Sequence, residues 1–242
     1  MAKSKKNRED RRRRREYEAR VAVNDRQRAR RRRDNVVASI AFVVVAALAA
    51  VGQVLFATGA FAPQPAAAPD PALAEGRSWT GAITFNDGLR LEVELDGAAA
   101  PQAVANAVSL SASGFYDGTS CHRLTTQGLF VLQCGDPEGT GQGGPGYSWG
   151  PVENAPEDGV YPAGTIAMAR VGGDGFSMGS QFFIVYEDTE LPSDEAGGYT
   201  VMGRVTGGLD QLVEQIAAPG VLDGSGDGAP AAPAVITSYT LQ

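Results

Sequence analysis

The stretch SWTGAITFNDGLRLEVEL, residues 78–95, sets the fold class of the chain. Apolar and polar residues alternate on both sides of the turn Asn86-Asp87-Gly88, over residues 78–85 and 89–95. A period of two is typical of strands with one buried face, and a short Asn/Asp/Gly turn between two such runs predicts a β-hairpin. We therefore expect a domain built on antiparallel strands.

Similar segments recur downstream of this hairpin. Two segments instead have apolar residues at helical spacing, residues 100–113 and 208–217. Many short strands with two short helices favour a mostly β fold, a closed antiparallel β-barrel with the helices over its ends. The further strands are predicted over residues 164–171, 180–186, 199–205 and 234–242.

Charge divides the chain into two unequal parts. Residues 1–35 carry 16 Lys and Arg and 6 Asp and Glu, a balance of +10. The remaining 207 residues carry 21 − 16 = 5 basic and 28 − 6 = 22 acidic side chains, a balance of −17. An arginine-rich tail could bind nucleic-acid phosphates, but the acidic remainder would repel them. We therefore expect no nucleic-acid partner.

Residues 36–57, VVASIAFVVVAALAAVGQVLFA, separate these two parts. A helix of this length reaches about 33 Å, enough for a hydrocarbon core of about 30 Å. A cleaved signal peptide is the alternative, but its apolar region is usually about 7–15 residues, and cleavage here would leave Pro63 at the new N-terminus. We predict one transmembrane helix in the cell membrane, with residues 1–35 cytoplasmic and the rest extracytoplasmic.

The segment after this helix is rich in Ala and Pro. Residues 58–76 include APQPAAAPDPALAEG and are expected to form an extended, semi-rigid linker. The remaining residues, 77–242, are enough for one domain with its own core.

Two glycine motifs suggest other functions. GTGQGG, residues 139–144, fits the dinucleotide-binding pattern, but Pro145 directly behind it stops the helix that this motif needs. GFSMG, residues 175–179, fits a nucleophile elbow around Ser177. The segment behind it resembles a strand, and the single histidine, His122, precedes the serine, which argues against an α/β-hydrolase.

Three longer motifs carry a more specific signal: CHRLTTQGLFVLQCGDPEGTGQGG (residues 121–144), IAMARVGGDGFSMGSQFFI (166–184) and YTVMGRVTGGLDQLVEQI (199–216). In this order they resemble the cyclophilins, which are peptidyl-prolyl cis–trans isomerases. The first motif is similar to the actinobacterial membrane-anchored type. The resemblance runs from Trp79 to the last strand and implies an eight-stranded closed antiparallel barrel capped by two helices.

Proline isomerisation requires particular chemical groups, and the resemblance assigns residues of this chain to them. Rotation about an X-Pro bond has a barrier of about 18–20 kcal/mol. Lowering it takes a donor to the prolyl nitrogen, an apolar pocket and partners for the rotating carbonyl, with no cofactor or metal. The resemblance implies that Arg123 is the catalytic donor. The substrate-binding residues that it implies are Phe130, Val131, Gln133, Ala169, Arg170, Gln181, Phe183, Leu191 and Tyr199.

Four of these assignments differ from the usual family residues: Val131 and Leu191 stand where methionine and tryptophan are common, and Arg170 and Tyr199 differ as well. Arg170 replaces a usual asparagine and could favour peptides with a carboxylate near the proline, and Tyr199 replaces a usual histidine. The backbone at residues 169–170 is expected to pair with the peptide. Strand alternation points His122 away from the face of Arg123, so we expect it to be structural.

Cys121 and Cys134 are the only cysteines. On the predicted topology both lie outside the cytoplasm, where disulfides persist. Strand alternation places them on opposite faces unless a bulge rotates one of them, so their pairing stays open. Two cysteines and one histidine are too few for a zinc site.

The sequence thus predicts a membrane-tethered peptidyl-prolyl isomerase that assists the folding of extracytoplasmic proteins. Its expected partners are proline-containing peptides and unfolded or secreted proteins, and we expect a monomer. The alternative is a non-catalytic domain that binds proline-containing segments as a chaperone or scaffold. Turnover distinguishes the two.

Overall fold

The computed structural model describes residues 30, 67–86 and 88–242. The chain forms two compact units, Met1–Gln64 and Pro65–Gln242. Apart from Arg30, the predicted cytoplasmic tail and the predicted transmembrane helix lie outside the described residues, as do residues 58–66 of the linker. Among the residues that are described, no helix has the length and apolar character needed to span a bilayer.

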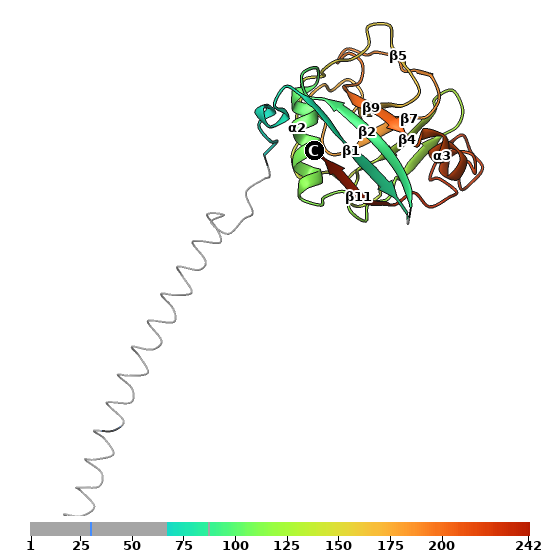
Figure 1. The fold of residues 1–242 in the computed structure, drawn as a ribbon, viewed down its shortest axis with the longest axis horizontal. Helices are drawn as coiled ribbons and strands as arrows, with labels where there is room; N and C mark the ends of the chain where they lie inside the picture. Colours follow the sequence, from blue (N-terminus) through green and yellow to red (C-terminus); the bar gives the residue numbers. More distant parts are fainter. Residues whose placement is uncertain (1–29, 31–66, 87) are drawn as a thin grey trace, which may run out of the picture. The chain divides into compact units, whose positions relative to one another are not determined.

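The second unit consists mainly of short strands with two short helical segments (Figure 1). The helices are α2 and α3, and α3 continues as a π-helix, η2. A 3₁₀ turn, η1, precedes the first strand. In chain order the elements are η1 (Pro71–Ala74), β1 (Ser78–Phe85), β2 (Leu89–Asp96), α2 (Pro101–Ala112), β3 (Arg123–Thr125), β4 (Val131–Cys134), β5 (Val160–Tyr161), β6 (Thr165–Met168), β7 (Phe182–Val185), β8 (Thr189–Glu190), β9 (Val201–Gly207), α3 (Leu209–Leu212), η2 (Val213–Ala217), β10 (Asp227–Gly228) and β11 (Ile236–Leu241).

Nine strands form one curled antiparallel sheet in the order β10-β3-β4-β7-β6-β9-β2-β1-β11, and β5 pairs with β8 in a separate ribbon. An isolated bridge, Ser120 to Val235, connects the segments that precede β3 and β11. The expectation of a closed eight-stranded barrel is met only in part. The fold is mostly β with two short helices, but this sheet has nine strands, and β10 and β11 stand at its two ends.

The predicted hairpin is confirmed. β1 and β2 pair along their whole length, from Ser78 opposite Asp96 to Phe85 opposite Leu89. The alternate residues of β2 from Leu89 to Leu95 are buried, as the period of two predicts. On the other side of β1, a Cβ atom at Gly81 would lie 1.9 Å from the carbonyl oxygen of Thr240, so the close approach of β11 requires glycine there.

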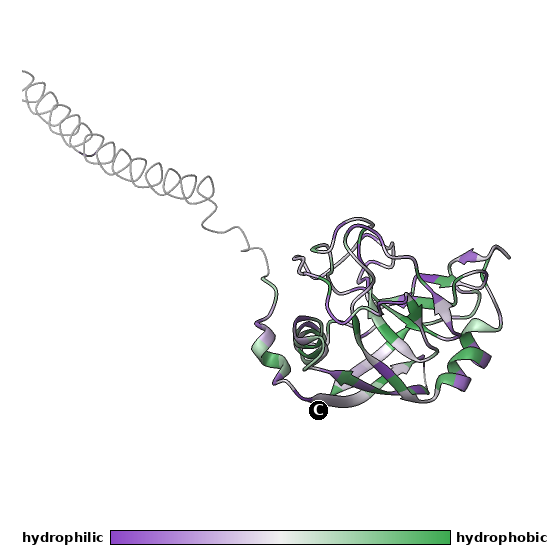
Figure 2. Ribbon diagram, turned by 90° about the horizontal axis from the view of Figure 1, so that it is seen from above, coloured by the Kyte–Doolittle hydropathy of each residue, from purple (hydrophilic) through white to green (hydrophobic). Residues whose placement is uncertain are grey.

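In Figures 1 and 2 the two helices, α2 and α3, lie on opposite sides of the strands. Pro101 is the first residue of α2, where the missing N–H costs no helical hydrogen bond. The buried face of α2 includes Val104, Ala107 and Leu110, which belong to the main core. Figure 2 shows hydrophobic residues, in green, along the strands and along both helices.

A second, smaller apolar cluster lies apart from the main core. It contains Val131 of β4, Phe183 and Val185 of β7, Ala167 of β6, and the nearby Tyr161 and Leu191. The neighbouring residues Leu132, Ile184 and Ile166 on the same three strands belong to the main core. These strands therefore bury both of their faces. One face packs in the main core, and the other, which we call the outer face, carries the smaller cluster.

The end of the predicted linker is folded where it is described. Asp70 caps η1 by accepting a hydrogen bond from the N–H of Ala72 (2.9 Å), and Ala74 is fully buried in the main core. The indole N–H of Trp79 donates to the carbonyl of Ala74 (2.9 Å), and the amide of Gln102 donates to the carbonyl of Pro69 (2.9 Å). Residues 67–76 thus differ from the extended spacer that their composition indicates.

Candidate active site

One row of residues crosses four neighbouring strands on the outer face of the sheet. Arg123 of β3 lies opposite Gln133 of β4, Gln133 lies opposite Phe183 of β7, and Phe183 lies opposite Ala167 of β6. Residues that are directly opposite in a sheet project from the same face. The register therefore places a guanidinium, an amide and an aromatic ring side by side.

A cavity of about 210 Å³ lies over this row. Eight of the ten predicted site residues line it, and Leu129 is a lining residue that sequence reasoning missed. Leu129 and Val131 are two residues apart and therefore share a face, so the period of two could have identified Leu129. The lining residues are Arg123, Leu129, Val131, Gln133, Ala169, Arg170, Phe183, Leu191 and Tyr199.

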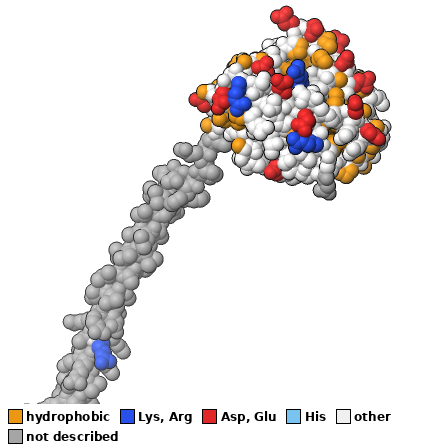
Figure 3. Space-filling model, in the orientation of Figure 1, with side chains coloured by type: hydrophobic (Ala, Val, Ile, Leu, Met, Phe, Trp, Pro, Cys, Tyr) orange, Lys and Arg blue, Asp and Glu red, His pale blue; other side chains and the backbone are white. Residues whose placement is uncertain are grey.

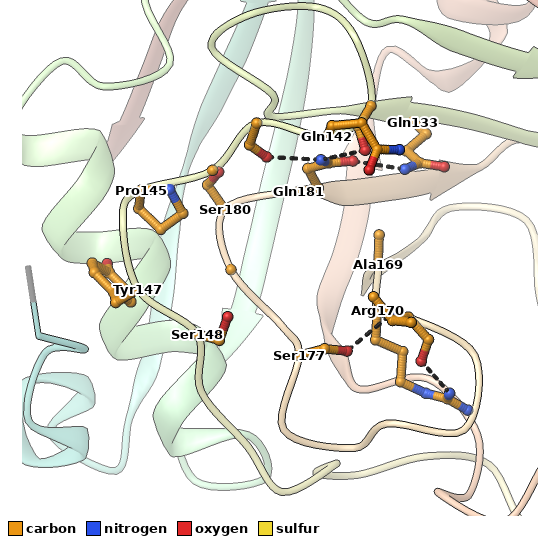
Figure 4. A pocket seen from close by; sticks show the side chains of 15 residues that line it. Gln133, Gln142, Pro145, Tyr147, Ser148, Ala169, Arg170, Ser177, Ser180 and Gln181 are labelled. Carbon is orange, nitrogen blue, oxygen red and sulfur yellow. Dashed lines mark hydrogen bonds between the residues drawn. The ribbon is translucent and has the colours of Figure 1, made fainter. Parts of the chain in front are cut away.

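The other two predicted residues lie elsewhere. Gln181 lines a neighbouring cavity of about 380 Å³, which shares Gln133, Ala169 and Arg170 with the first (Figure 4). Phe130 lines neither cavity. Because Phe130 lies between Leu129 and Val131, strand alternation points its side chain away from the cavity that they line. Its ring packs edge-on against Tyr186, with centroids 6.0 Å apart.

Arg123 is held by two side chains. Its Nε and Nη2 atoms each donate to one carboxylate oxygen of Asp227, both at 2.7 Å. Its Nη1 donates to Oε1 of Gln133 at 3.4 Å. The hydrogen bonds to Asp227 raise the pKa of Arg123 above its usual value, so this side chain stays charged at any physiological pH.

A hydrogen-bonded chain continues from Gln133 into the loop after β4. Nε2 of Gln133 donates to Oε1 of Gln181 (2.9 Å), and Nε2 of Gln181 donates to the carbonyls of Gly141 (3.1 Å) and Gly143 (2.9 Å). Figure 4 shows the two glutamines side by side beneath this loop. The orientation of both amides is thereby fixed toward the cavities.

That loop is organised around the fully buried carboxylate of Asp136. The carboxylate accepts the backbone N–H groups of residues 138, 140, 141 and 143. Burial alone would raise the pKa of Asp136, but these bonds and one from the Thr140 side chain lower it to about 2. The N–H groups of the GTGQGG motif thus bind an internal carboxylate and open no helix, so the dinucleotide-binding interpretation is wrong.

The floor and one wall of the smaller cavity are apolar and aromatic. Phe183 is 5% exposed, and Val131 and Leu191 are buried beside it. The ring of Tyr199 meets Phe183 edge-on, with centroids 5.5 Å apart. This arrangement suits a small saturated ring, and the polar groups of Arg123 and Gln133 stand at its edge.

Arg170 does not offer its charge to the cavity. Its side chain is fully buried, and its guanidinium forms a two-pronged ion pair with Asp194 (2.8 and 2.9 Å) and donates to the carbonyls of Val171, Gly197 and Gly198. Figure 4 shows this side chain turning away from Gln133 and Gln181. The guanidinium packs 4.7 Å from the centre of the Tyr199 ring. The expectation that Arg170 selects carboxylate-bearing peptides is therefore wrong, because Asp194 already neutralises it.

The backbone at residues 169 and 170 differs from the Arg170 side chain in its hydrogen bonding. The N–H of Ala169 donates to the carbonyl of Gln181 (3.0 Å). The N–H of Arg170 forms no hydrogen bond within the described part of the chain. An unpaired N–H at a cavity edge can pair with an extended peptide.

His122 and Ser177 have no place in a nucleophilic relay. Both ring nitrogens of His122 are buried without a partner among the described residues, and burial lowers the pKa of His122. The hydroxyl of Ser177 donates to the carbonyl of Asp174 (2.7 Å) and accepts the N–H of Val171 (2.8 Å). Ser177 therefore stabilises a turn, and the hydrolase interpretation is not supported.

Cys121 and Cys134 form a disulfide. The alternation argument against it was wrong because β3 begins only at Arg123. At Cys121 the backbone N–H instead donates to the carbonyl of Ala234 (2.7 Å), so the chain leaves the β4 ladder there. The disulfide joins the two segments that carry Arg123 and Gln133.

Comparisons with known proteins agree with this geometry. The family model of cyclophilin type peptidyl-prolyl cis-trans isomerase/CLD matches residues 82–241. The chain is similar to the probable peptidyl-prolyl cis-trans isomerase B of Mycobacterium tuberculosis, with 44% identity over 154 residues, 58% of this chain and 47% of the relative. It is also 44% identical over 132 residues to peptidyl-prolyl cis-trans isomerase B of Bacillus subtilis, covering 54% of this chain and 86% of that relative.

A solved structure is similar as well. It is a Cryptosporidium parvum cyclophilin type peptidyl-prolyl cis-trans isomerase in the presence of the dipeptide Ala-Pro, with a TM-score of 0.55 and 29% identity. The match covers 67% of this chain and 98% of the other. The chain spans about half the length of the mycobacterial relative and most of the Bacillus one.

Proposed function

Because this chain belongs to the cyclophilin-type peptidyl-prolyl cis–trans isomerases, we propose that it catalyses rotation about X-Pro peptide bonds. The observation that carries the proposal is the row from Arg123 through Gln133 to Phe183, which sets a fixed cation beside an apolar cavity. Such a pairing matches the two demands of the reaction, a grip on the proline ring and a donor for the prolyl nitrogen.

In the proposed mechanism the proline ring enters the cavity of about 210 Å³ and rests on Phe183 between Leu191 and Tyr199. Amide resonance is lost as the X-Pro bond twists, and the nitrogen regains its lone pair. Arg123 donates a hydrogen bond to that lone pair, which it cannot do in the planar ground state. This interaction is stronger in the transition state than with bound substrate, so it lowers the barrier.

The remaining polar groups orient the peptide. The free N–H of Arg170 pairs with the peptide backbone, and Gln133 contacts the peptide carbonyl. Both sites are rigid, since Gln133 is bound to Gln181 and the Arg170 side chain is clamped by Asp194. A preorganised site spends little binding energy on ordering itself.

We further propose that the protein is of the membrane-anchored actinobacterial type and assists the folding of extracytoplasmic proteins. The apolar run of residues 36–57 and the arginine-rich residues before it support a single-pass anchor with a cytoplasmic N-terminus. The disulfide supports an oxidising compartment for the domain. One domain supplies every residue of the cavity, which supports a monomer acting on proline-containing segments of unfolded or secreted proteins.

The test is NMR exchange spectroscopy on a short Ala-Pro peptide with a catalytic amount of the full chain in detergent micelles. We expect faster cis–trans exchange, and a loss of about 100-fold in the catalysed rate for Arg123→Ala, the size typical of removing a transition-state donor. Arg204→Ala, which removes an exposed arginine outside the cavity, is the matched control and should keep the rate.

A different result would favour the non-catalytic alternative. If the peptide binds but its exchange is not accelerated at any protein concentration, the domain is a proline-segment binder. Equal rates for the wild type and Arg123→Ala would remove Arg123 from the proposed mechanism while leaving the activity in place.

A further inference from the structure

Every arginine described between residues 67 and 242 contacts an acidic side chain, but only one of these contacts involves the proposed catalytic group. Resting on the proposed function, we propose that Asp227 is a positioning residue for the isomerase reaction. It holds the Nε and Nη2 side of the Arg123 guanidinium so that the opposite side faces the cavity. The sequence motifs do not predict Asp227 as a site residue.

The backbone places this carboxylate with little freedom. Asp227 and Gly228 form β10, which pairs with β3 by setting Asp227 opposite Thr125 and Gly228 opposite Leu124. The hydroxyl of Ser225 donates to the carbonyl of Asp227 (2.9 Å), and the N–H of Thr126 donates to the carbonyl of Gly226 (2.8 Å). Asp227 is thus attached to the same strand that carries Arg123, so the backbone pairing sets where its carboxylate stands relative to that arginine.

The geometry leaves a defined set of donors for substrate. A guanidinium has five N–H groups. Two of them bind Asp227 and a third makes the long bond to Gln133. The other two, one on Nη1 and one on Nη2, have no acceptor among the described residues and lie on the side away from Nε. They are the groups available to a prolyl nitrogen and its neighbouring carbonyl.

Arg123 needs such a support because its side chain is 38% exposed and its contact with Gln133 is long. A long, half-exposed arginine without an anchor samples many rotamers and points into water in most of them. Small errors in the placement of a catalytic group reduce rates strongly. The two short bonds to Asp227 select one rotamer before substrate arrives.

The experiment compares Asp227→Ala with Glu94→Ala in the full chain in micelles. Glu94 is the matched control, because it makes an equally short contact with an arginine, Arg204 (2.7 Å), away from the cavity. We expect kcat/KM for the Ala-Pro peptide to fall about tenfold in Asp227→Ala, mainly through kcat, and to stay within about twofold of wild type in Glu94→Ala.

One resonance and two further variants separate a loss of positioning from a loss of the fold. The side-chain Nε–H resonance of Arg123, identified by its absence in Arg123→Lys, should lose its protection from solvent exchange in Asp227→Ala. Asp227→Glu, which keeps a carboxylate, should recover part of kcat. Asp227→Asn has nearly the same shape but offers one acceptor oxygen instead of two, and should lose about threefold.

The outcomes are distinct from those that test the activity itself. A wild-type chain that does not accelerate exchange removes the proposed function. An active wild type with a folded Asp227→Ala variant of equal or greater kcat overturns the role of Asp227 alone. If Asp227→Ala does not fold, Asp227→Asn decides, and full kcat in that variant also overturns the inference.

Discussion

Asp136 shows how one side chain fixes the shape of a loop at the site. Its buried carboxylate accepts four backbone N–H groups, and the carbonyls of the same loop hold Gln181. We expect Asp136→Asn to lower the free energy of unfolding at pH 7 by about 2 kcal/mol, because the amide loses the charge and turns an N–H₂ group toward N–H donors. Chemical denaturation measures this loss, and the exposed Glu138→Gln in the same loop is its control.

The pH dependence of this stabilisation follows from its sign. Hydrogen bonding lowers the pKa of Asp136 to about 2 in the folded state, below the ordinary 3.8. The stabilisation is therefore complete above about pH 5 and is lost as the pH falls through 3.8 toward 2. The difference in stability between wild type and Asp136→Asn should shrink over that range. A difference that stays constant down to pH 2 would contradict the role of the ionised carboxylate.

Single residues also show where sequence reasoning stops. Arg123, Gln133 and Phe183 were predictable because each lies in a motif, and the register of short strands brings them together. Asp194 lies 24 residues after Arg170, in a loop without a recognisable pattern. Its carboxylate turns the predicted substrate-facing charge into a buried clamp, a change that only the folded chain reveals.

The segment before β1 gives a prediction for an element. η1 contributes Ala74 to the core and accepts the Trp79 indole N–H, and residue 69 accepts the amide of Gln102. A fragment that begins at Gly76 loses these contacts, whereas one that begins at Pro65 keeps them. We expect the shorter fragment to be less stable by about 2 kcal/mol, since two hydrogen bonds and a buried alanine are removed.

Thermal unfolding of the two fragments measures this difference, which should be several degrees in Tm. A third fragment that begins at Pro65 and carries Asp70→Ala loses only the cap of η1 and should fall in between. Equal Tm values for the fragments that begin at Pro65 and Gly76 would mean that η1 adds nothing to the stability of the domain.

The longer elements were predictable because their burial is periodic. β1, β2 and α2 lie within a few residues of their expected bounds, since each shows several repeats of its pattern. β5, β8 and β10 contain two residues each, too few for any periodicity. β10 was missed for this reason, and with it the carboxylate that it sets against Arg123.

Outside its first 35 residues the chain is strongly acidic, with five basic and 22 acidic side chains. Its five arginines all contact acidic partners, so most of the 22 acidic side chains have no basic neighbour in the described part of the chain. Figure 3 shows acidic groups spread over the visible face, with the few basic groups of the domain beside them. Repulsion among these carboxylates destabilises the folded state.

Salt should therefore stabilise this protein. Raising NaCl from about 10 mM to about 0.5 M shortens the screening length from about 30 Å to below 8 Å and weakens the long-range repulsion. The exposed ion pairs lose attraction as well, but such pairs are worth little. We expect a rise of a few degrees in the Tm of the fragment that begins at Pro65, measured by thermal unfolding at pH 7.

Replacing the exposed Glu187, Glu190 and Glu195 by Gln should raise the Tm at low salt and reduce the gain from NaCl. A Tm that falls as NaCl is added would mean that the ion pairs outweigh the repulsion.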